Sequence, residues 1–280
     1  MMQLGVATPI VVSSARDWTP WSEHAGIVEL AELTRAAERL GYTHVTCSEH
    51  IIMTDSEAPR RGRSYWDPLA TFGYLSAVTD TIRFVTNVLV LGYHHPLEIA
   101  KRYGTLDMIS GGRLTLGVGV GTLKEEFDLI GAPFDDRGAR GDDALRCLQA
   151  CLSKGRVSYE GPYYQFHDLI VEPHAVQQPV PIWIGGRTLR SLRRAIEFGH
   201  GWSPFGLRLE QVRAMLDQVD VPEHLDIVLG TDQLLDPIGK PDEAKAALAA
   251  AEAAGVTICT PTIVSRSLAH HIEQLEALRS

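Results

Sequence analysis

The chain has 280 residues, of which 45% are hydrophobic and 22% are charged, and its formal net charge is −9. This composition is typical of a globular protein with a large core, and the negative charge argues against nucleic acid and anionic membranes as partners. No apolar run approaches the length of a membrane span, and the N-terminus lacks the basic and apolar regions of a signal peptide. We therefore expect a cytoplasmic protein that acts on a small molecule.

Segments typical of strands and segments typical of helices alternate along the chain. The expected strands are Gln3–Val11, Thr43–Cys47, Ile82–Leu91, Leu114–Val120, Pro181–Ile184, Gly201–Phe205, Leu225–Gly230 and Val256–Val264. The expected helices are Ala25–Leu40, Pro68–Thr79, Pro96–Ser110, Asp142–Leu152, Leu189–Phe198, Leu209–Val219, Asp242–Ala254 and Leu268–Leu278. Such a series of pairs favours one (β/α)8 TIM barrel over residues 1–280, because parallel strands need crossover connections. A doubly wound open sheet is the alternative, although it usually has fewer repeats.

Two segments depart from this alternation. Ile51–Trp66 is a long polar loop after the second strand. Arg156–Phe166 is predicted to form a hairpin that turns at Gly161-Pro162 and is inserted before the fifth strand. Because the active sites of such barrels lie on the loops that follow the strands, the first segment is expected on the catalytic face.

Residues 82–121 are the most informative part of the chain. They read as strand, helix and strand, and the second strand ends in the alternating series Gly117, Gly119 and Gly121. Glycines at a strand end leave bare backbone against which a flat ligand can lie. The fifth strand ends in Gly185-Gly186-Arg187-Thr188 before a helix, which favours an anion site at the positive helix end. Together the two strand ends predict a platform for the ring and the phosphate of a flavin-like cofactor.

Histidines follow two of the expected strands. His50 follows the second strand, where its reference pKa suits acid–base catalysis near neutral pH, and a histidine hydrogen-bonded into a loop is the equal alternative. His94 and His95 follow the third strand next to Pro96, so we expect them to shape the start of a helix.

Metal chemistry is not favoured by the sequence. His270 and His271 lie on the last expected helix, where we expect them on the surface, and no His-Glu-x-x-His occurs. The cysteines lack Cys-x-x-Cys spacing, so reduced thiols are expected. They are Cys47, Cys147, Cys151 and Cys259.

Carboxylates keep a glycosidase open as an alternative class, since such an enzyme needs two facing carboxylates. Glu125 and Glu126 follow the fourth strand, and Asp232 follows the seventh. Both glutamates also fit the first turn of a helix, where a negative charge complements the helix dipole. We favour that structural interpretation for them.

Several motifs occur in an order that is far more specific than any one of them. They are Gly41-Tyr42 through Glu49-His50, Asp67-Pro68-Leu69-Ala70, Thr86-Asn87-Val88-Leu89, His95-Pro96, Ala100-Lys101, Thr105-Leu106-Asp107, Ser110-Gly111-Gly112-Arg113, Gly117–Gly121, Glu125-Glu126-Phe127, Gly131, Arg137-Gly138, Pro181–Gly186 and Gly201-Trp202. With these motifs, roughly residues 1–205 resemble the luciferase-like monooxygenase superfamily. The resemblance is strongest to its branch that uses the deazaflavin coenzyme F420.

The resemblance implies a barrel with the cofactor ring over the carboxyl ends of its strands. It implies a non-prolyl cis peptide at Asn87–Val88 below the ring and Glu49-His50 as the catalytic pair. Some deazaflavin dehydrogenases of the family place a catalytic glutamate where this chain has Thr122, so His50 would act alone or with a group that the motifs do not identify. The cofactor-binding positions that it implies are Asn87, Val88, Gly119, Gly121, Thr122, Gly185, Gly186, Arg187 and Thr188.

The resemblance therefore implies an F420-dependent oxidoreductase that moves a hydride between the deazaflavin and an unknown small organic substrate, and we expect a homodimer. An FMN-dependent monooxygenase that uses reduced FMN and oxygen is the alternative. A non-catalytic flavin- or deazaflavin-binding protein is the alternative from another class.

The substrate pocket is expected between the loop after the second strand, the hairpin and the loops after strands six to eight. Trp66 is predicted to contact the cofactor ring, and Tyr163 and Tyr164 are candidate pocket residues. Arg61, with Arg60 and Arg63, is predicted either to contact the acidic tail of the deazaflavin or to belong to a solvated surface loop.

Overall fold

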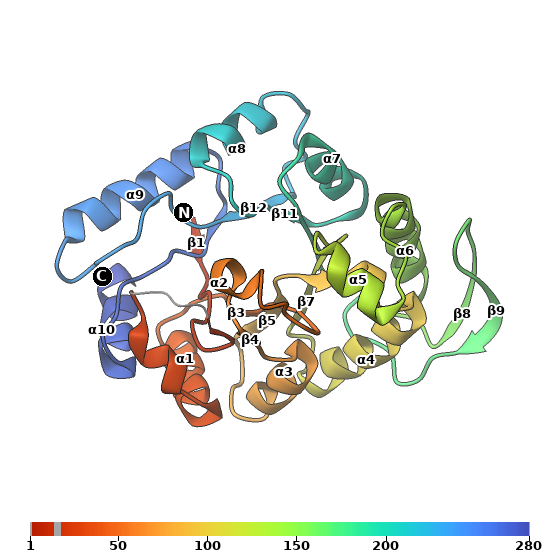
Figure 1. The fold of residues 1–280 in the computed structure, drawn as a ribbon, viewed down its shortest axis with the longest axis horizontal. Helices are drawn as coiled ribbons and strands as arrows, with labels where there is room; N and C mark the ends of the chain where they lie inside the picture. Colours follow the sequence, from red (N-terminus) through yellow and green to blue (C-terminus); the bar gives the residue numbers. More distant parts are fainter. Residues whose placement is uncertain (1, 14–17, 280) are drawn as a thin grey trace.

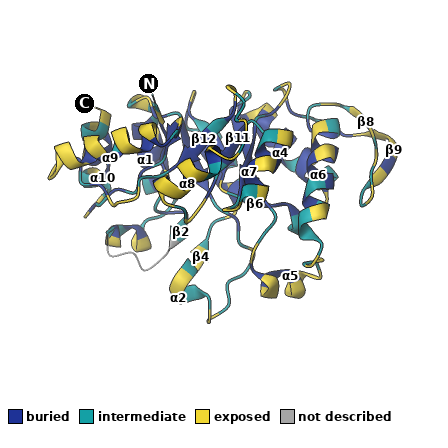
Figure 2. Ribbon diagram, turned by 90° about the horizontal axis from the view of Figure 1, so that it is seen from above, coloured by how far each residue is buried: buried dark blue, intermediate teal, exposed yellow. Residues whose placement is uncertain are grey.

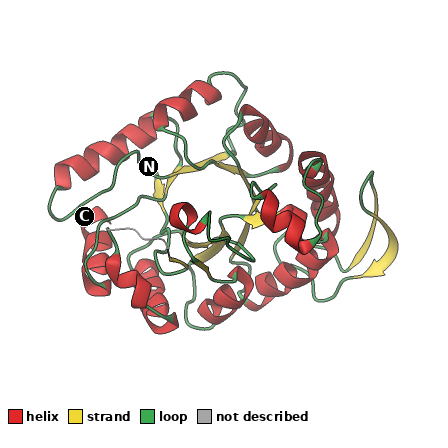
Figure 3. Ribbon diagram, viewed as in Figure 1, coloured by secondary structure: helices red, strands yellow, loops and turns green. Residues whose placement is uncertain are grey.

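The protein is a closed ring of parallel strands surrounded by helices (Figures 1 and 3). The computed structural model describes residues 2–13 and 18–279. Within them the strand order is β1-β13-β12-β11-β10-β7-β5-β3, and a parallel bridge between Val6 and Val45 joins the first and last of these. The predicted (β/α)8 barrel is therefore confirmed.

The strands of the ring are β1 (Gln3–Leu4), β3 (His44–Cys47), β5 (Arg83–Thr86), β7 (Leu114–Gly119), β10 (Ile182–Gly185), β11 (Gly201–Ser203), β12 (Asp226–Leu229) and β13 (Ile258–Cys259), with β6 (Leu89–Val90) also paired to β7. The helices that follow them are α1 (Ile27–Arg39), α3 (Pro68–Ser76), α4 (Pro96–Ile109), α6 (Arg137–Cys151), α7 (Leu189–Phe198), α8 (Leu209–Leu216), α9 (Pro241–Ala253) and α10 (Leu268–Arg279). Shorter elements are β2 (Val12–Ser13), η1 (Pro20–His24), α2 (Ala58–Arg61), β4 (Ser64–Tyr65), η2 (Leu91–Tyr93), α5 (Lys124–Ile130), β8 (Arg156–Glu160) and β9 (Gln165–Ile170).

Three of the expected strands are much shorter than the sequence pattern predicts. Of Val256–Val264 only β13 and an isolated bridge at Ile263 remain. The strand expected over Gln3–Val11 keeps only β1 and the bridge at Val6, and the chain bends at residues 9–11 before β2 pairs with β4. Pro9 lacks the backbone N–H that would continue a ladder there. The strand expected over Ile82–Leu91 divides into β5 and β6 around a cis peptide bond between Asn87 and Val88, which confirms the implied position of that bond.

Side-chain caps place the helices that follow the strands. Asp67 caps α3, with its carboxylate 2.8 Å from the backbone nitrogen of Ala70, and Pro68 is the first helical residue. His95 caps α4 in the same way, because its Nδ1 accepts a hydrogen bond from the backbone N–H of Leu97 at 3.1 Å. The prediction that His95 shapes the start of a helix is therefore confirmed.

The main apolar core combines residues of the ring strands with residues of the surrounding helices, whose outward faces are exposed (Figure 2). Val85, Trp183, Val228 and Ile258 form a separate buried cluster inside the ring. Fully buried side chains of this kind stabilise the fold by about 1.5–3 kcal/mol each.

The elements outside the barrel repeat lie at different places around it. The short elements α2, β4 and α5 project from one side of the ring, and α2 lies over its opening (Figures 2 and 3). This side carries the carboxyl ends of the strands. The antiparallel hairpin β8–β9 lies at the outer edge of the molecule, beyond α4 and α6 (Figure 1).

Within residues 2–13 and 18–279, no helix combines the length and the hydropathy that crossing a membrane requires. The same residues contain no cluster of three or more His, Cys, Asp or Glu side chains able to hold a metal ion. The four cysteines are free and buried.

Candidate active site

A cavity of about 490 Å³, here called the main cavity, opens at the carboxyl ends of β3, β6, β7 and β10. Its volume suits a cofactor-sized ligand. It brings together twelve of the thirteen residues predicted for catalysis, cofactor binding or ligand contact, whereas Trp66 and the candidate pocket residues Tyr163 and Tyr164 lie outside its described lining. The twelve are Glu49, His50, Arg61, Asn87, Val88, Gly119, Gly121, Thr122, Gly185, Gly186, Arg187 and Thr188.

The glycines of the main cavity make room for Val88. A Cβ atom on Gly119 would lie 2.8 Å from Val88 Cγ2, and one on Gly185 would lie 2.7 Å from Val88 Cγ1. A side chain at either position would therefore displace the isopropyl group. The expectation of bare backbone beneath a ligand needs correction, because the platform at this point is the Val88 side chain, laid across two glycines.

His50 has a buried carboxylate partner. Its Nδ1 lies 2.8 Å from Oε2 of Glu126, and its ring packs edge-on against Tyr65 with the centroids 4.5 Å apart. Because the carboxylate accepts a hydrogen, the proton of the neutral imidazole sits on Nδ1. Nε2 is then left as the nitrogen that can take up or release a proton at the cavity.

Glu126 is fully buried, and its carboxylate is held from four sides. Oε2 also accepts from the Tyr93 hydroxyl at 2.6 Å, and Oε1 accepts from the backbone N–H groups of Ile51 at 2.5 Å and Ile52 at 3.2 Å. Burial alone would raise the pKa of Glu126, but the hydrogen bonds from His50, Tyr93 and Ile52 lower it below its ordinary value. The carboxylate is therefore ionised and holds the His50 ring in one orientation.

The placement of Glu126 corrects the structural interpretation of the glutamate pair. Both glutamates do lie in the first turn of α5, but only Glu125 is exposed there. Glu126 is also the partner of His50 that the motifs did not identify. No local signal in the sequence could have identified this partner, since the two residues are 76 positions apart and belong to different βα units.

Glu49 does not pair with His50. Its Oε2 accepts from the backbone N–H of Val90 at 2.7 Å, and its Oε1 lies 2.6 Å from His94 Nε2. Burial alone would lower the pKa of His94, but the hydrogen bond to Glu49 raises it above its ordinary value. Glu49 and His94 therefore form an ion pair that holds β6 just after the Asn87–Val88 bond. Glu49 and His50 are not hydrogen-bond partners of each other, and a catalytic role for Glu49 stays a prediction.

Cations gather at the part of the main cavity next to α7. Thr188 caps this helix by accepting from Ser191 N, and Thr188, Arg190 and Ser191 at its positive end line the cavity. Arg194 is buried and bonded to Asp142, whereas Arg187 and Arg190 are exposed at the rim. The arginines that line the main cavity are Arg61, Arg137, Arg187, Arg190 and Arg194. This end of the cavity suits a phosphate or carboxylate group.

Arg61 is the one arginine of the loop trio in the described lining of the main cavity. It lies in α2, its Nε is 2.6 Å from Glu57 Oε2, and its Nη2 is 3.4 Å from Thr122 Oγ1. Arg60 and Arg63 are exposed outside the lining. Arg61 is thus placed to contact an anionic ligand, although Glu57 offsets part of its charge.

Tyr65 lines the main cavity, as do Tyr93 and Phe205, whereas Trp66 does not belong to its described lining. Trp66 donates its backbone N–H to Val11 O and packs on the hydrophobic core. Its neighbour Tyr65 therefore lies at the cavity where we expected Trp66. The hairpin residues Tyr163 and Tyr164 also lie away from the cavity, where their backbone N–H groups donate to Asp143. The described lining of the main cavity includes no residue of the hairpin.

The last correction concerns α10. His270 is partly exposed, but His271, which we expected on the surface, is buried with 4% of its area exposed. Neighbouring residues of a helix lie about 100° apart around its axis, so one of the pair can face solvent while the other faces the barrel.

Comparison with known proteins identifies the family. The family model described as luciferase-like monooxygenase matches residues 2–224. The chain belongs to this family. The resemblance expected from the motifs is thereby confirmed.

The luciferase-like relatives include enzymes with different cofactors. Over 194 residues the chain is 29% identical to an F420-dependent glucose-6-phosphate dehydrogenase from Intrasporangium calvum. This alignment covers 66% of this chain and 56% of that protein. Over 219 residues the chain is 26% identical to an FMNH2-dependent dimethylsulfone monooxygenase from Pseudomonas putida. This alignment covers 76% of this chain and 57% of that protein. The chain spans less than two thirds of the length of the curated relatives it matches.

The crystal structure of a monooxygenase from Streptomyces bottropensis has the same fold. Its TM-score is 0.76 at 21% identity, and the match covers 99% of this chain and 98% of that one. The chain is thus a luciferase-like barrel of a family that contains monooxygenases and F420-dependent dehydrogenases.

Proposed function

We propose that this protein is an F420-dependent oxidoreductase that moves a hydride between the deazaflavin and a small organic substrate. The observation that carries the proposal is the His50–Glu126 pair, because its His50 lines the same cavity as Val88 and the arginines near α7. When bound, the deazaflavin supplies hydride chemistry at the carbon equivalent to flavin N5. The protein then has to orient the ring, hold its anionic part and handle a proton.

Each of these tasks has residues suited to it. Val88, laid over Gly119 and Gly185, offers an apolar surface for one face of the ring. Thr188 and Arg187, at the start of α7, suit the phosphate, because free N–H groups and a cation converge there. Of the remaining cations, Arg61 suits an acidic tail.

The proton is the task of His50. Glu126 fixes the proton of the neutral ring on Nδ1, so Nε2 accepts a proton from the substrate in one direction of the reaction and returns it in the other. The ionised carboxylate stabilises the imidazolium that forms when Nε2 is protonated. His50 is therefore proposed as the acid–base residue, and Glu126 as the residue that positions it.

Reduced FMN is the second candidate cofactor. The FMNH2-dependent relative aligns with 76% of this chain, against 66% for the F420-dependent one. A non-catalytic binding protein is less well supported, since Glu126 supplies the carboxylate partner that the sequence alone did not reveal.

The decisive experiment is a titration of the purified protein with coenzyme F420 and with FMN, each oxidised and reduced. We expect the deazaflavin to bind more tightly. Clearly tighter binding of FMN would overturn the assignment of the cofactor, and failure of both to bind would overturn the proposed function. With the cofactor identified, a His50→Asn variant should still bind it but lose on the order of 10²–10⁴-fold in turnover.

A further inference from the structure

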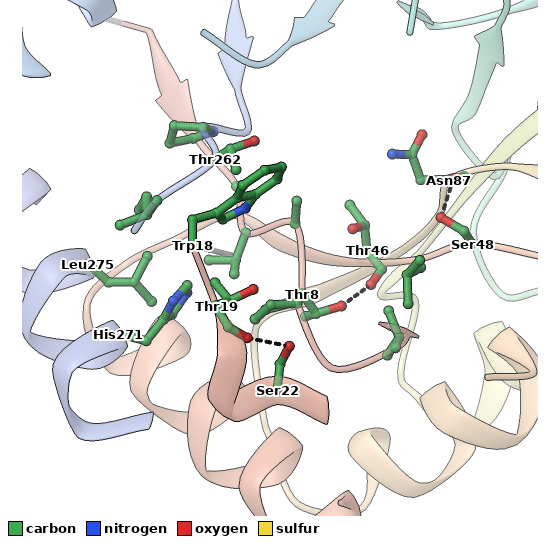
Figure 4. A pocket seen from close by; sticks show the side chains of 18 residues that line it. Thr8, Trp18, Thr19, Ser22, Thr46, Ser48, Asn87, Thr262, His271 and Leu275 are labelled. Carbon is green, nitrogen blue, oxygen red and sulfur yellow. Dashed lines mark hydrogen bonds between the residues drawn. The ribbon is translucent and has the colours of Figure 1, made fainter. Parts of the chain in front are cut away.

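A second cavity of about 170 Å³, here called the β1–β13 cavity, lies beside the main cavity (Figure 4). It is lined by residues that follow β1 and β13, by the segment around Trp18 and by α10. Ser48 and Asn87 line both cavities, and the Ser48 hydroxyl donates to Asn87 O at 2.7 Å. The two cavities therefore adjoin beside the Asn87–Val88 bond, where the proposed ring would lie.

His271 lines this second cavity, and one nitrogen of its ring has no partner among the described residues. The ring projects from α10 toward Trp18 and Thr19 (Figure 4). Its Nε2 is buried and makes no hydrogen bond with any residue in the part of the chain that the structure describes. An unpaired buried nitrogen costs about 1–3 kcal/mol, so this one needs an explanation.

The contacts of Nδ1, the other nitrogen of the His271 ring, show that Nε2 carries a hydrogen. Ser265 Oγ lies 3.0 Å from His271 Nδ1 and accepts a hydrogen bond from Trp21 Nε1 at 2.9 Å. Tryptophan can only donate, so the hydroxyl hydrogen of the fully buried Ser265 goes to Nδ1. Burial, with His270 nearby, lowers the pKa of His271 to about 4, so the ring is neutral near pH 7. Its single N–H is then on Nε2.

The rest of the described lining is uncharged and combines apolar side chains with hydroxyls and one amide. Apart from the histidine, none of the described lining residues has an ionisable side chain. The hydroxyls of Thr8 and Ser22 already donate to backbone oxygens, to Thr46 O at 2.6 Å and Thr19 O at 2.8 Å. Their oxygens therefore face a ligand as acceptors, and His271 provides a donor.

We infer that the β1–β13 cavity is the substrate subsite, that it takes a compact, uncharged molecule with an acceptor oxygen, and that His271 Nε2–H donates to that oxygen. The inference rests on the proposed function, because only an enzyme would treat the bound molecule as a substrate. The described lining offers no cation for a sugar phosphate, a sulfonate or a carboxylate, so we expect the subsite to bind the uncharged molecule more tightly.

The test uses the cofactor-loaded protein with histidine labelled by ¹⁵N, and cyclohexanone as the probe. Cyclohexanecarboxylate and cyclohexylammonium have the same ring with a negative or a positive charge. We expect cyclohexanone to shift the His271 Nε2–H resonance and to bind at least about tenfold more tightly than either charged compound. Equal binding of a charged compound, binding that leaves this resonance unmoved, or no binding of cyclohexanone would overturn the inference.

Variants of the two neighbouring histidines provide a matched control. His271→Gln should weaken cyclohexanone binding about tenfold, as expected for loss of one buried hydrogen bond, whereas His270→Gln should leave it unchanged. The wild-type resonance decides the question if the buried variant does not fold. Repeating the titration without cofactor separates the two proposals. Cyclohexanone binding in a protein that binds neither deazaflavin nor FMN would overturn the proposed function alone, and cofactor binding without cyclohexanone binding would overturn the subsite alone.

Discussion

His50 and Glu126 are separated by 76 residues, yet His50 Nδ1 lies 2.8 Å from Glu126 Oε2 inside the mouth of the barrel. The pair joins the loop after β3 to the start of α5. The sequence left His50 between a catalytic and a structural role. The pair fixes the proton of the neutral His50 ring on Nδ1 and leaves Nε2 without a bond to any described residue.

Glu126→Gln should lower turnover by about 10²–10⁴-fold while leaving cofactor affinity within about twofold of the wild type. The amide is nearly isosteric, but it no longer fixes the tautomer of His50 or stabilises its protonated form. Steady-state kinetics and a cofactor titration on the same preparation separate the two effects. Glu125→Gln, in the same turn of α5 but exposed, is the control and should behave as wild type. Equal losses in both variants would contradict the role given to Glu126.

The ion pair between Glu49 and His94 should make stability depend on pH. The folded pKa of His94 is raised above the ordinary value of 6.5, so the pair contributes its full stability below pH 6.5 and loses it as the pH rises through the raised value. Chemical denaturation of the wild type and of His94→Gln should therefore show a larger difference in unfolding free energy below pH 6.5 than well above it. A difference that stays constant, or grows with pH, would show that the histidine is neutral in the folded protein.

Substitution of Gly119 should show that Val88 needs the space beside it. Gly119→Ala places a Cβ 2.8 Å from Val88 Cγ2 and should destabilise the protein by about 1–3 kcal/mol and weaken cofactor binding. Adding Val88→Ala should restore part of the stability, because the clashing methyl group is gone, so the two changes should not be additive. Thermal unfolding measures this double-mutant cycle.

Gly73→Ala is the control for that cycle. An added Cβ at Gly73 meets no atom within 4 Å, and the residue lies within α3, so this change should stabilise the protein by about 0.5–1 kcal/mol. Destabilisation of similar size by Gly119→Ala and Gly73→Ala would mean that the loss is general to glycine replacement. It would contradict the claim that Val88 needs the space beside Gly119.

Arg61→Ala should weaken binding of the deazaflavin about tenfold and binding of FMN much less, because FMN lacks the acidic tail. Raising the salt concentration should reduce the difference between wild type and variant, since an exposed ionic contact is screened. Arg60→Ala is the matched control, as Arg60 pairs with the same Glu57 but lies outside the described lining of the main cavity. If the two variants bind the deazaflavin alike, the loop contributes only general charge.

The sequence by itself predicted the features that depend on neighbouring residues. The alternation of apolar runs and helical periodicity predicted the (β/α)8 barrel, and Pro96 after His95 predicted the start of α4. The motif Thr86-Asn87-Val88-Leu89 implied the position of the cis peptide bond, which the structure has. For the strands, the helices and the cap the cause is local, because these features are determined within a few positions. The position of the cis bond came from the resemblance to the family.

Only the tertiary structure decided which side chains meet. Glu126 could not be distinguished from Glu125, nor Tyr65 from Trp66, because each pair fits the same local pattern and differs only in the direction of its side chains. Glu49 was expected beside His50 but pairs with His94, a partner 45 residues away. Such contacts arise when ring closure brings the ends of successive strands together at one face, and their geometry depends on the pairing of the strands rather than on any one segment. The sequence therefore determined the barrel and the set of candidate residues, and the closed ring decided their pairing.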